Sequence, residues 1–90
     1  MLDTLTAPKK ESIQTHDIYH AAYLLASGSK LEDAVISRNG KKKVLFEFSH
    51  PNIAKLTHEY ISGEGVINIR FLKSALDHLK GIVFEKMNEH

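Results

Sequence analysis

Hydrophobic residues recur along three segments of the chain at the spacing of helices that bury one side. In the first segment, residues 15–27, the predicted buried stripe consists of Ile18, Ala21, Ala22 and Leu25. Thr15 has the hydroxyl of an N-cap, and Gly28 can take the left-handed conformation that ends a helix. The pattern therefore predicts a short helix between these two residues.

The other two helices are predicted in the second half of the chain. His50-Pro51 begins one, because proline is favoured at the first helical position, and residues 62–65, with two glycines, end it. The last helix runs from Asn68, a good N-cap, to about Lys86. Its apolar seam, with spacings of 3 and 4, consists of Ile69, Leu72, Leu76, Leu79 and Val83.

Residues 31–48 read as a β-hairpin, because Asn39-Gly40 is a strong hairpin signal. A two-residue turn would place Asp33 opposite Phe46, whereas a three-residue turn with a glycine bulge would shift the pairing by one. The second register is preferred, since it keeps a carboxylate off the apolar face. That face then carries Ala34, Ile36, Val44, Phe46 and Phe48, and the opposite face carries Val35 and Leu45.

The predicted fold class is α+β, in the order helix, strand, strand, helix, helix. Residues 1–14 show no period, so we expect a flexible N-terminal tail. Residues 15–90 then form a single α+β domain, as a chain of 90 residues suggests. A two-stranded antiparallel hairpin would pack against the helices, with the seam of the long C-terminal helix on one of its faces.

Composition narrows the class of protein. Hydrophobic residues make up 42% of the chain and charged residues 26%, which is typical of a folded domain. The chain has no cysteine, which excludes disulfides, thiolate zinc sites and cysteine nucleophiles. No apolar run has the length of a signal peptide or a membrane span, so we expect a cytoplasmic protein with no membrane contact.

Four cations at the predicted hairpin tip are a candidate nucleic-acid site. They lie within six residues with no acid between them: Arg38, Lys41, Lys42 and Lys43. A basic β-ribbon can contact phosphates or enter a major groove, with salt-dependent binding. The simpler interpretation is that lysines at a hairpin end prevent edge-to-edge pairing.

Histidines are a candidate metal site. His16 and His20 are four residues apart, so on one helix both would face the same ion. The glutamate of a zinc-protease motif is missing, and scattered surface histidine is the simpler interpretation. We therefore predict no metal and no cofactor.

Catalytic residues are not predicted anywhere in the chain. The serines have no nucleophile-elbow context. Ser49 and His50 are adjacent, but one or the other is better explained as the cap of the second helix. Gly63-Glu64-Gly65 lacks the spacing, lysine and preceding strand of a phosphate-binding loop. The chain is therefore predicted not to be an enzyme.

Surplus apolar surface is a candidate protein interface. Its residues are Val35 and Leu45 on the second hairpin face, with Phe71 and Phe84 beside the seam of the last helix. Exposed apolar and aromatic side chains of this kind anchor interfaces. The alternative is that the helices cover them all.

Several stretches resemble a small bacterial family of domains of unknown function. They are Ile18 to Gly28, Arg38-Asn39-Gly40, Val44 to Phe48, Glu59 to Glu64 and Phe71 to Lys80. The resemblance spans about Thr15 to Phe84, and it implies a module of a helix, a hairpin and two helices, sometimes found in mobile or phage-derived gene contexts. It implies no activity and no catalytic residues.

Two functions from different classes follow from these patterns. The leading hypothesis is a non-enzymatic module that binds another protein or forms a homodimer. The alternative is a nucleic-acid-binding accessory protein that uses the basic hairpin tip.

Overall fold

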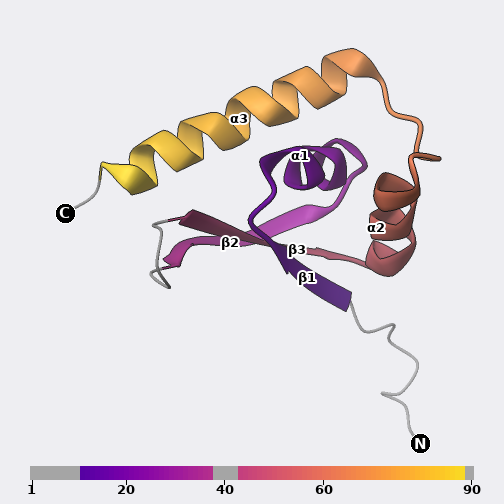
Figure 1. Cartoon of the computed structure of the whole chain (residues 1–90), viewed down its shortest axis with the longest axis horizontal. Helices are drawn as coiled ribbons and strands as arrows, with labels where there is room; N and C mark the ends of the chain where they lie inside the picture. The colour runs from indigo at the N-terminus through magenta and orange to yellow at the C-terminus, as the bar shows by residue number, and fades with distance from the viewer. Residues whose placement is uncertain (1–10, 38–42, 89–90) are drawn as a thin grey trace, which may run out of the picture.

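The computed structural model describes residues 11–37 and 43–88. Within these residues the chain forms three helices and one three-stranded antiparallel sheet, an α+β fold (Figure 1). In chain order the elements are β1 (Glu11–Thr15), α1 (Ile18–Ala26), β2 (Lys30–Ser37), β3 (Lys43–His50), α2 (Ile53–Ser62) and α3 (Ile69–Met87). The predicted fold class is confirmed, and the sheet has one strand more than the predicted hairpin.

The additional strand, β1, pairs antiparallel with β3, so that Ile13 lies opposite Phe48 and β3 is the central strand. The predicted tail is therefore wrong for residues 11–14, which lie in the sheet. Its other residues, 1–10, lie outside the described part of the chain. A strand of five residues with Ile13 as its one hydrophobic residue has too weak a period to be recognised, and its formation depends on pairing with β3.

The hairpin of β2 and β3 has the preferred register. Ala34 lies opposite Phe46, and Val35 lies opposite Leu45. Residues 38–42, which contain the predicted turn, lie outside the described residues. A bulge between Leu31 and Asp33, near the start of β2, shifts the pairing by one residue. The register before the bulge therefore differs by one from the register in the rest of the hairpin.

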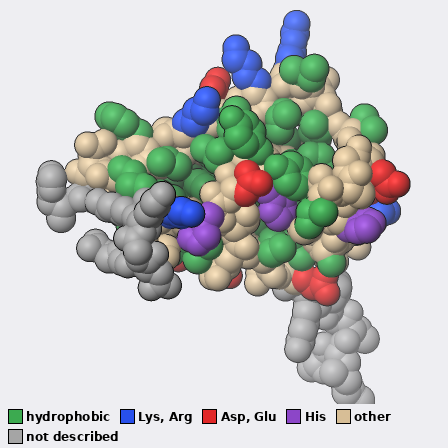
Figure 2. All heavy atoms as spheres, in the orientation of Figure 1, with side chains coloured by type: hydrophobic (Ala, Val, Ile, Leu, Met, Phe, Trp, Pro, Cys, Tyr) green, Lys and Arg blue, Asp and Glu red, His purple; other side chains and the backbone are tan. Residues whose placement is uncertain are grey.

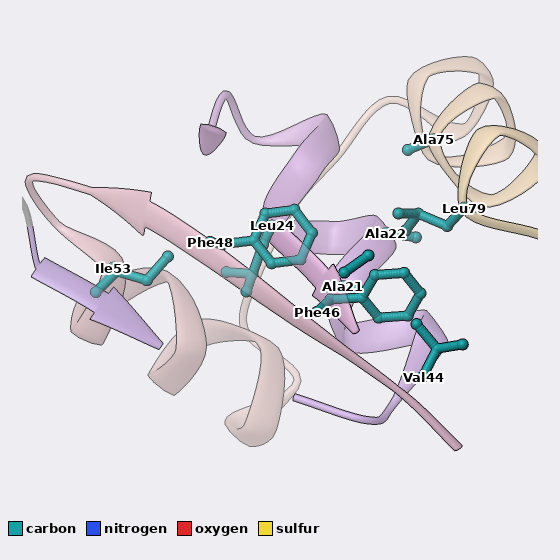
Figure 3. Packing of buried hydrophobic residues seen from close by; sticks show 10 residues of the cluster. Ala21, Ala22, Leu24, Val44, Phe46, Phe48, Ile53, Ala75 and Leu79 are labelled. Carbon is teal, nitrogen blue, oxygen red and sulfur yellow. The ribbon is translucent and has the colours of Figure 1, made fainter. Parts of the chain in front are cut away.

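Helix α1 lies at the centre of the molecule, between the sheet and α3, with α2 at one side (Figure 1). Ala21 and Ala22 have no exposed surface; Ala21 lies beside Phe46, and Ala22 is directed toward Leu79 (Figure 3). These two small side chains allow α1 to approach elements on both sides. A helix buried on most of its surface must be apolar nearly all round, which explains why one stripe describes α1 poorly.

Helix α3 packs mainly on α1 and also contacts the sheet at β2. The prediction that its seam packs on one face of the hairpin is therefore correct only in part, because α1 occupies most of that position. Ala75 and Leu79 are the buried residues of α3, whereas Ile69, at the start of the predicted seam, is 79% exposed. With 19 residues α3 is about twice as long as α1, which has 9, so its ends extend past the helix that buries its middle.

The start of α1 differs from the prediction. Asp17, not Thr15, is the N-cap, and its Oδ1 accepts hydrogen bonds from the amides of Tyr19 at 2.9 Å and His20 at 3.3 Å. Thr15 instead ends β1. Gly28 has the predicted positive φ, +96°, just after the helix.

The start of α2 also differs. The helix begins at Ile53, and Pro51 lies in the turn before it. The ring of His50 supports this turn, because its Nδ1 accepts a hydrogen bond from the amide of Asn52 at 2.9 Å. Gly63 ends α2 with a φ of +78°. Asn68 is the N-cap of α3, as predicted.

Candidate functional site

A buried histidine connects β1, α1 and α2. His20 is only 8% exposed, and its Nδ1 lies 3.2 Å from the hydroxyl of Thr15 while its Nε2 lies 3.1 Å from that of Thr57. The ring stacks on Tyr60 with centroids 4.9 Å apart. Each ring nitrogen thus has a hydroxyl partner on a different element, which satisfies a buried polar side chain.

Two tyrosines extend this network to carboxylates. Tyr60 Oη donates to Asp17 Oδ2 at 3.1 Å, and Tyr23 Oη donates to Glu59 Oε1 at 3.3 Å. Burial, with the nearby carboxylate adding to it, raises the pKa of both phenols above the usual value of 10.0. Burial lowers the pKa of His20 below 6.5, and the charge of Asp17 opposes this in part. The network is therefore stable with a neutral imidazole and neutral phenols.

The pair of His20 and Thr57 has the atoms of a base and a hydroxyl nucleophile, but its surroundings fit a structural role. The imidazole is buried. In a catalytic pair, the second ring nitrogen of the base usually contacts a carboxylate that orients it, whereas in His20 this nitrogen contacts the hydroxyl of Thr15. A hollow on the described surface lies elsewhere, on α3, and is lined by Asp77, His78, Gly81, Ile82, Phe84 and Glu85. Because these residues share one helix, the hollow is open on its other sides.

The two histidines considered for metal binding do not share a helix face. His16 precedes the N-cap of α1, and its Nδ1 lies 3.4 Å from the carbonyl oxygen of Val44. His20 uses both nitrogens on threonines. Among residues 11–37 and 43–88, no group of three or more His, Asp or Glu side chains is placed to hold a metal ion.

The side of the sheet that faces away from α1 is called the outer face. It carries Ser12 and Gln14 from β1, Lys30, Asp33, Val35 and Ser37 from β2, and Lys43, Leu45, Glu47 and Ser49 from β3. The core cluster is built from the opposite side of the sheet and from the helices, and it includes neither Val35 nor Leu45. Val35 is 44% exposed and Leu45 is half-buried, so the outer face exposes apolar surface.

Charges on the outer face are unevenly distributed. Asp33 and Glu47 lie directly opposite each other on β2 and β3, and Lys43 lies beyond Leu45 on the other side. Within the described residues Lys30, which lies on the outer face in the row next to these carboxylates, forms an ion pair with Glu32 at 4.0 Å, and no lysine or arginine nitrogen lies that close to Asp33 or Glu47. Like charges placed opposite each other in a sheet are destabilising.

Most of the predicted nucleic-acid-binding residues lie outside the described part of the chain. Lys43 is exposed and lies at the start of β3. Arg38, Lys41 and Lys42 lie outside the described residues. Lys43 shares the outer face with two carboxylates, which repel a phosphate backbone.

The predicted aromatic interface residues on α3 are exposed but do not lie together. Phe71 is 63% exposed and Phe84 is 71% exposed. Thirteen residues of helix separate them by about 20 Å and place them on nearly opposite sides of α3. In Figure 2, hydrophobic side chains gather between α3 and the sheet, and lysine and arginine side chains project outward from α3.

Comparison with protein families identifies the family of this chain. A family model described as a domain of unknown function, DUF5659, matches residues 10–85. The chain belongs to the DUF5659 family. The resemblance noted in the sequence is therefore confirmed at the level of a domain family without an assigned function. Neither a curated protein nor a solved structure matches the chain.

The extent of the DUF5659 match agrees with the structure. It begins one residue before β1 and ends inside α3, so it contains the third strand as well as the predicted helices and hairpin. Within the described part of this DUF5659 domain, no helix has the length and apolar character needed to cross a membrane.

Sequence reasoning missed the network around His20 and the charge pattern of the outer face. Thr57 lies 37 residues from His20, and nothing in the local sequence connects them. The charge pattern of the outer face can be recognised in the sequence once the hairpin register is chosen, because Lys43, Leu45 and Glu47 alternate with buried residues of β3.

Proposed function

We propose that this DUF5659 domain is a non-enzymatic protein-interaction module that acts through the outer face of its sheet. The observation that carries the proposal is the apolar pair Val35 and Leu45, which lies outside the core and on the side away from α1. Apolar residues rimmed by charges are typical of interaction sites. A cytoplasmic location is part of the proposal and is supported by the absence of cysteine.

The non-enzymatic part of the proposal is supported by the network around His20. The imidazole of His20 lies within hydrogen-bonding distance of hydroxyls on β1 and α2, and the phenol of Tyr60 on α2 donates to the carboxylate of Asp17, so the groups that could transfer protons connect these elements to one another. A protein partner is favoured over nucleic acid because the carboxylates of Asp33 and Glu47 share the outer face with Lys43.

The test compares proteins retained from an extract of the source organism. Because the chain has no cysteine, an added Asn88→Cys at the end of α3 allows attachment at one point away from the sheet. We expect a partner to be retained by the otherwise unchanged protein and lost from Leu45→Arg. The matched control is Ala54→Arg, at an exposed position of α2, which should retain the partner. Identical retention by all three proteins would contradict the proposal.

A further inference from the structure

The outer face has four rows of side chains across β2 and β3. Lys30 and Ser49 form the first row, Asp33 and Glu47 the second, Val35 and Leu45 the third, and Ser37 and Lys43 the fourth. Successive rows are about 7 Å apart, because two residues of a strand span that length. The apolar row therefore lies midway between two carboxylates and a lysine.

We propose that the outer face binds a second copy of this chain in a two-fold symmetric dimer. The proposal rests on the proposed function and names the partner. The two-fold axis runs between the sheets, across the strands, at the level of Val35 and Leu45. This axis reverses the strand direction of the second sheet and keeps β3 over β3, so that the same surface meets itself.

Charge complementarity selects this arrangement. With the axis across the strands, Glu47 of one copy lies over Lys43 of the other, Asp33 lies over Ser37 beside that lysine, and the apolar rows meet at the centre. With the axis along the strands, the carboxylates of the two copies would face each other, which is unfavourable. Facing sheets pack about 10 Å apart with strands within about 30° of each other, a gap that lysine and glutamate side chains from opposite sheets can bridge.

A cation from a second copy would also relieve a repulsion between Asp33 and Glu47 within the isolated chain. Asp33 and Glu47 repel each other across β2 and β3. Lys30 in the neighbouring row pairs with Glu32 at 4.0 Å, and no lysine or arginine nitrogen in the described residues lies within 4.0 Å of Asp33 or Glu47. Lys43 of a second copy would supply that cation twice in a symmetric dimer. The dimer thus offsets a repulsion that the single chain contains.

The size of the face determines the strength of association. Strands of up to eight residues in a three-stranded sheet give a face of roughly 14 by 26 Å. This is below the area that stable interfaces bury on each partner, about 800 Å². We therefore expect a dissociation constant in the range from tens of micromolar to about 1 mM.

The test uses two charge reversals of the full chain, Lys43→Glu and Glu47→Lys, studied by sedimentation from about 10 μM to 1 mM. Lys43 is exposed and Glu47 is half-buried on the outer face, so both variants should fold, which circular dichroism checks. Each variant alone should dimerise at least about tenfold more weakly, because the reversed charge meets a like charge twice. An equimolar mixture should recover dimerisation, since every reversed residue then faces an opposite charge.

Two comparisons make the result specific. Lys73→Glu, the same reversal on an exposed position of α3, should dimerise like the original chain. Glu47→Lys should raise the thermal midpoint of the monomer while weakening the dimer, because it removes the repulsion with Asp33.

The proposal would be wrong if the protein without substitutions remained monomeric over the whole concentration range. It would also be wrong if a mixture of the two variants dimerised no better than either alone, or if both reversals left the dimer intact. In each of these cases, retention of another protein that depends on Leu45 would leave the proposed function standing and would reject only the second copy as its partner.

Discussion

At the scale of single residues, Gly65 packs closely against Tyr23, a contact that the sequence did not suggest. A Cβ at Gly65 would collide with Tyr23 Oη and would lie 2.7 Å from its Cζ. The tyrosine is 6% exposed and hydrogen-bonded to Glu59, so its ring cannot simply move away. The joint between α2 and α3 therefore requires glycine for space.

We predict that Gly65→Ala destabilises the domain by about 1–3 kcal/mol, the range for overpacking. The matched control is Gly81→Ala, inside α3, where a Cβ would meet nothing within 4 Å. That change should stabilise by about 0.5–1 kcal/mol, because alanine is the better helix former. Urea unfolding of both variants measures the difference, and equal effects would contradict the steric account.

His20 gives a pH dependence whose sign follows from its burial. Its pKa in the folded chain is lowered below 6.5, so the unfolded chain binds more protons in the interval between the two values. The contribution of neutral His20 to stability is complete above about pH 6.5 and is lost as the pH falls through 6.5 toward the folded pKa.

An NMR titration should place the imidazole of His20 below 6.5. In Asp17→Asn the value should fall further, because the carboxylate of Asp17 raises the pKa of His20 in the original chain. Asparagine remains a good N-cap, so α1 should stay intact. A pKa that rises in the variant would contradict the assigned role of Asp17.

At the scale of elements, α1 determines how the layers stack. It is the shortest helix of the described residues, yet it lies between the sheet and α3, where Ala21 and Ala22 have no exposed surface. Alanine at both positions lets the sheet and α3 pack close to α1. Because α1 is buried on both sides, its apolar residues do not form a single stripe. Helix α3 then contributes Ala75 and Leu79 to the core from the second layer.

We predict that Ala22→Leu costs about 1–3 kcal/mol of unfolding free energy, because the added atoms must displace packed neighbours on α3. Ala54→Leu, on an exposed position of α2, makes the same chemical change and should stay within about 0.5 kcal/mol of the original. Thermal unfolding of the pair tests this. If both variants were equally stable, Ala22 would not lie in a tight interface.

At the scale of the whole molecule, β1 converts the hairpin into a sheet with a central strand. Its pairing with β3 joins residues near position 13 to residues near position 48, and Ile13 packs against the core. A two-stranded hairpin alone is marginal in water, so a third strand strengthens the surface on which α1 lies.

Ile13→Ala should therefore destabilise the whole domain, by about 1–3 kcal/mol for a partly buried side chain. Gln14→Ala changes the neighbouring residue, which is exposed on the outer face, and should cost less than about 0.5 kcal/mol. Chemical denaturation followed by circular dichroism compares them. Equal stability of the two variants would show that β1 contributes little to the fold.

Local sequence was sufficient for several features. These features are the left-handed conformation of Gly28, the N-cap Asn68 and the hairpin register. Each follows from the steric and burial preferences of residues that are close together in the sequence. In the register, a single shift would have placed Asp33 on the apolar face, and this penalty is legible without coordinates.

Tertiary structure decided what depends on residues far apart in the chain. Strand β1 exists because β3 offers a partner, the polar contacts of His20 join threonines on β1 and α2, and α1 rather than α3 covers the sheet. The charge rows of the outer face depend on both sequence and tertiary structure. The sequence by itself determined the alternation of Lys43, Leu45 and Glu47. The folded sheet placed Asp33 beside Glu47, and the described core packs on the other side of the sheet. The physical reason is that spacing along a chain encodes which side of an element is apolar, whereas only packing decides which element covers that side.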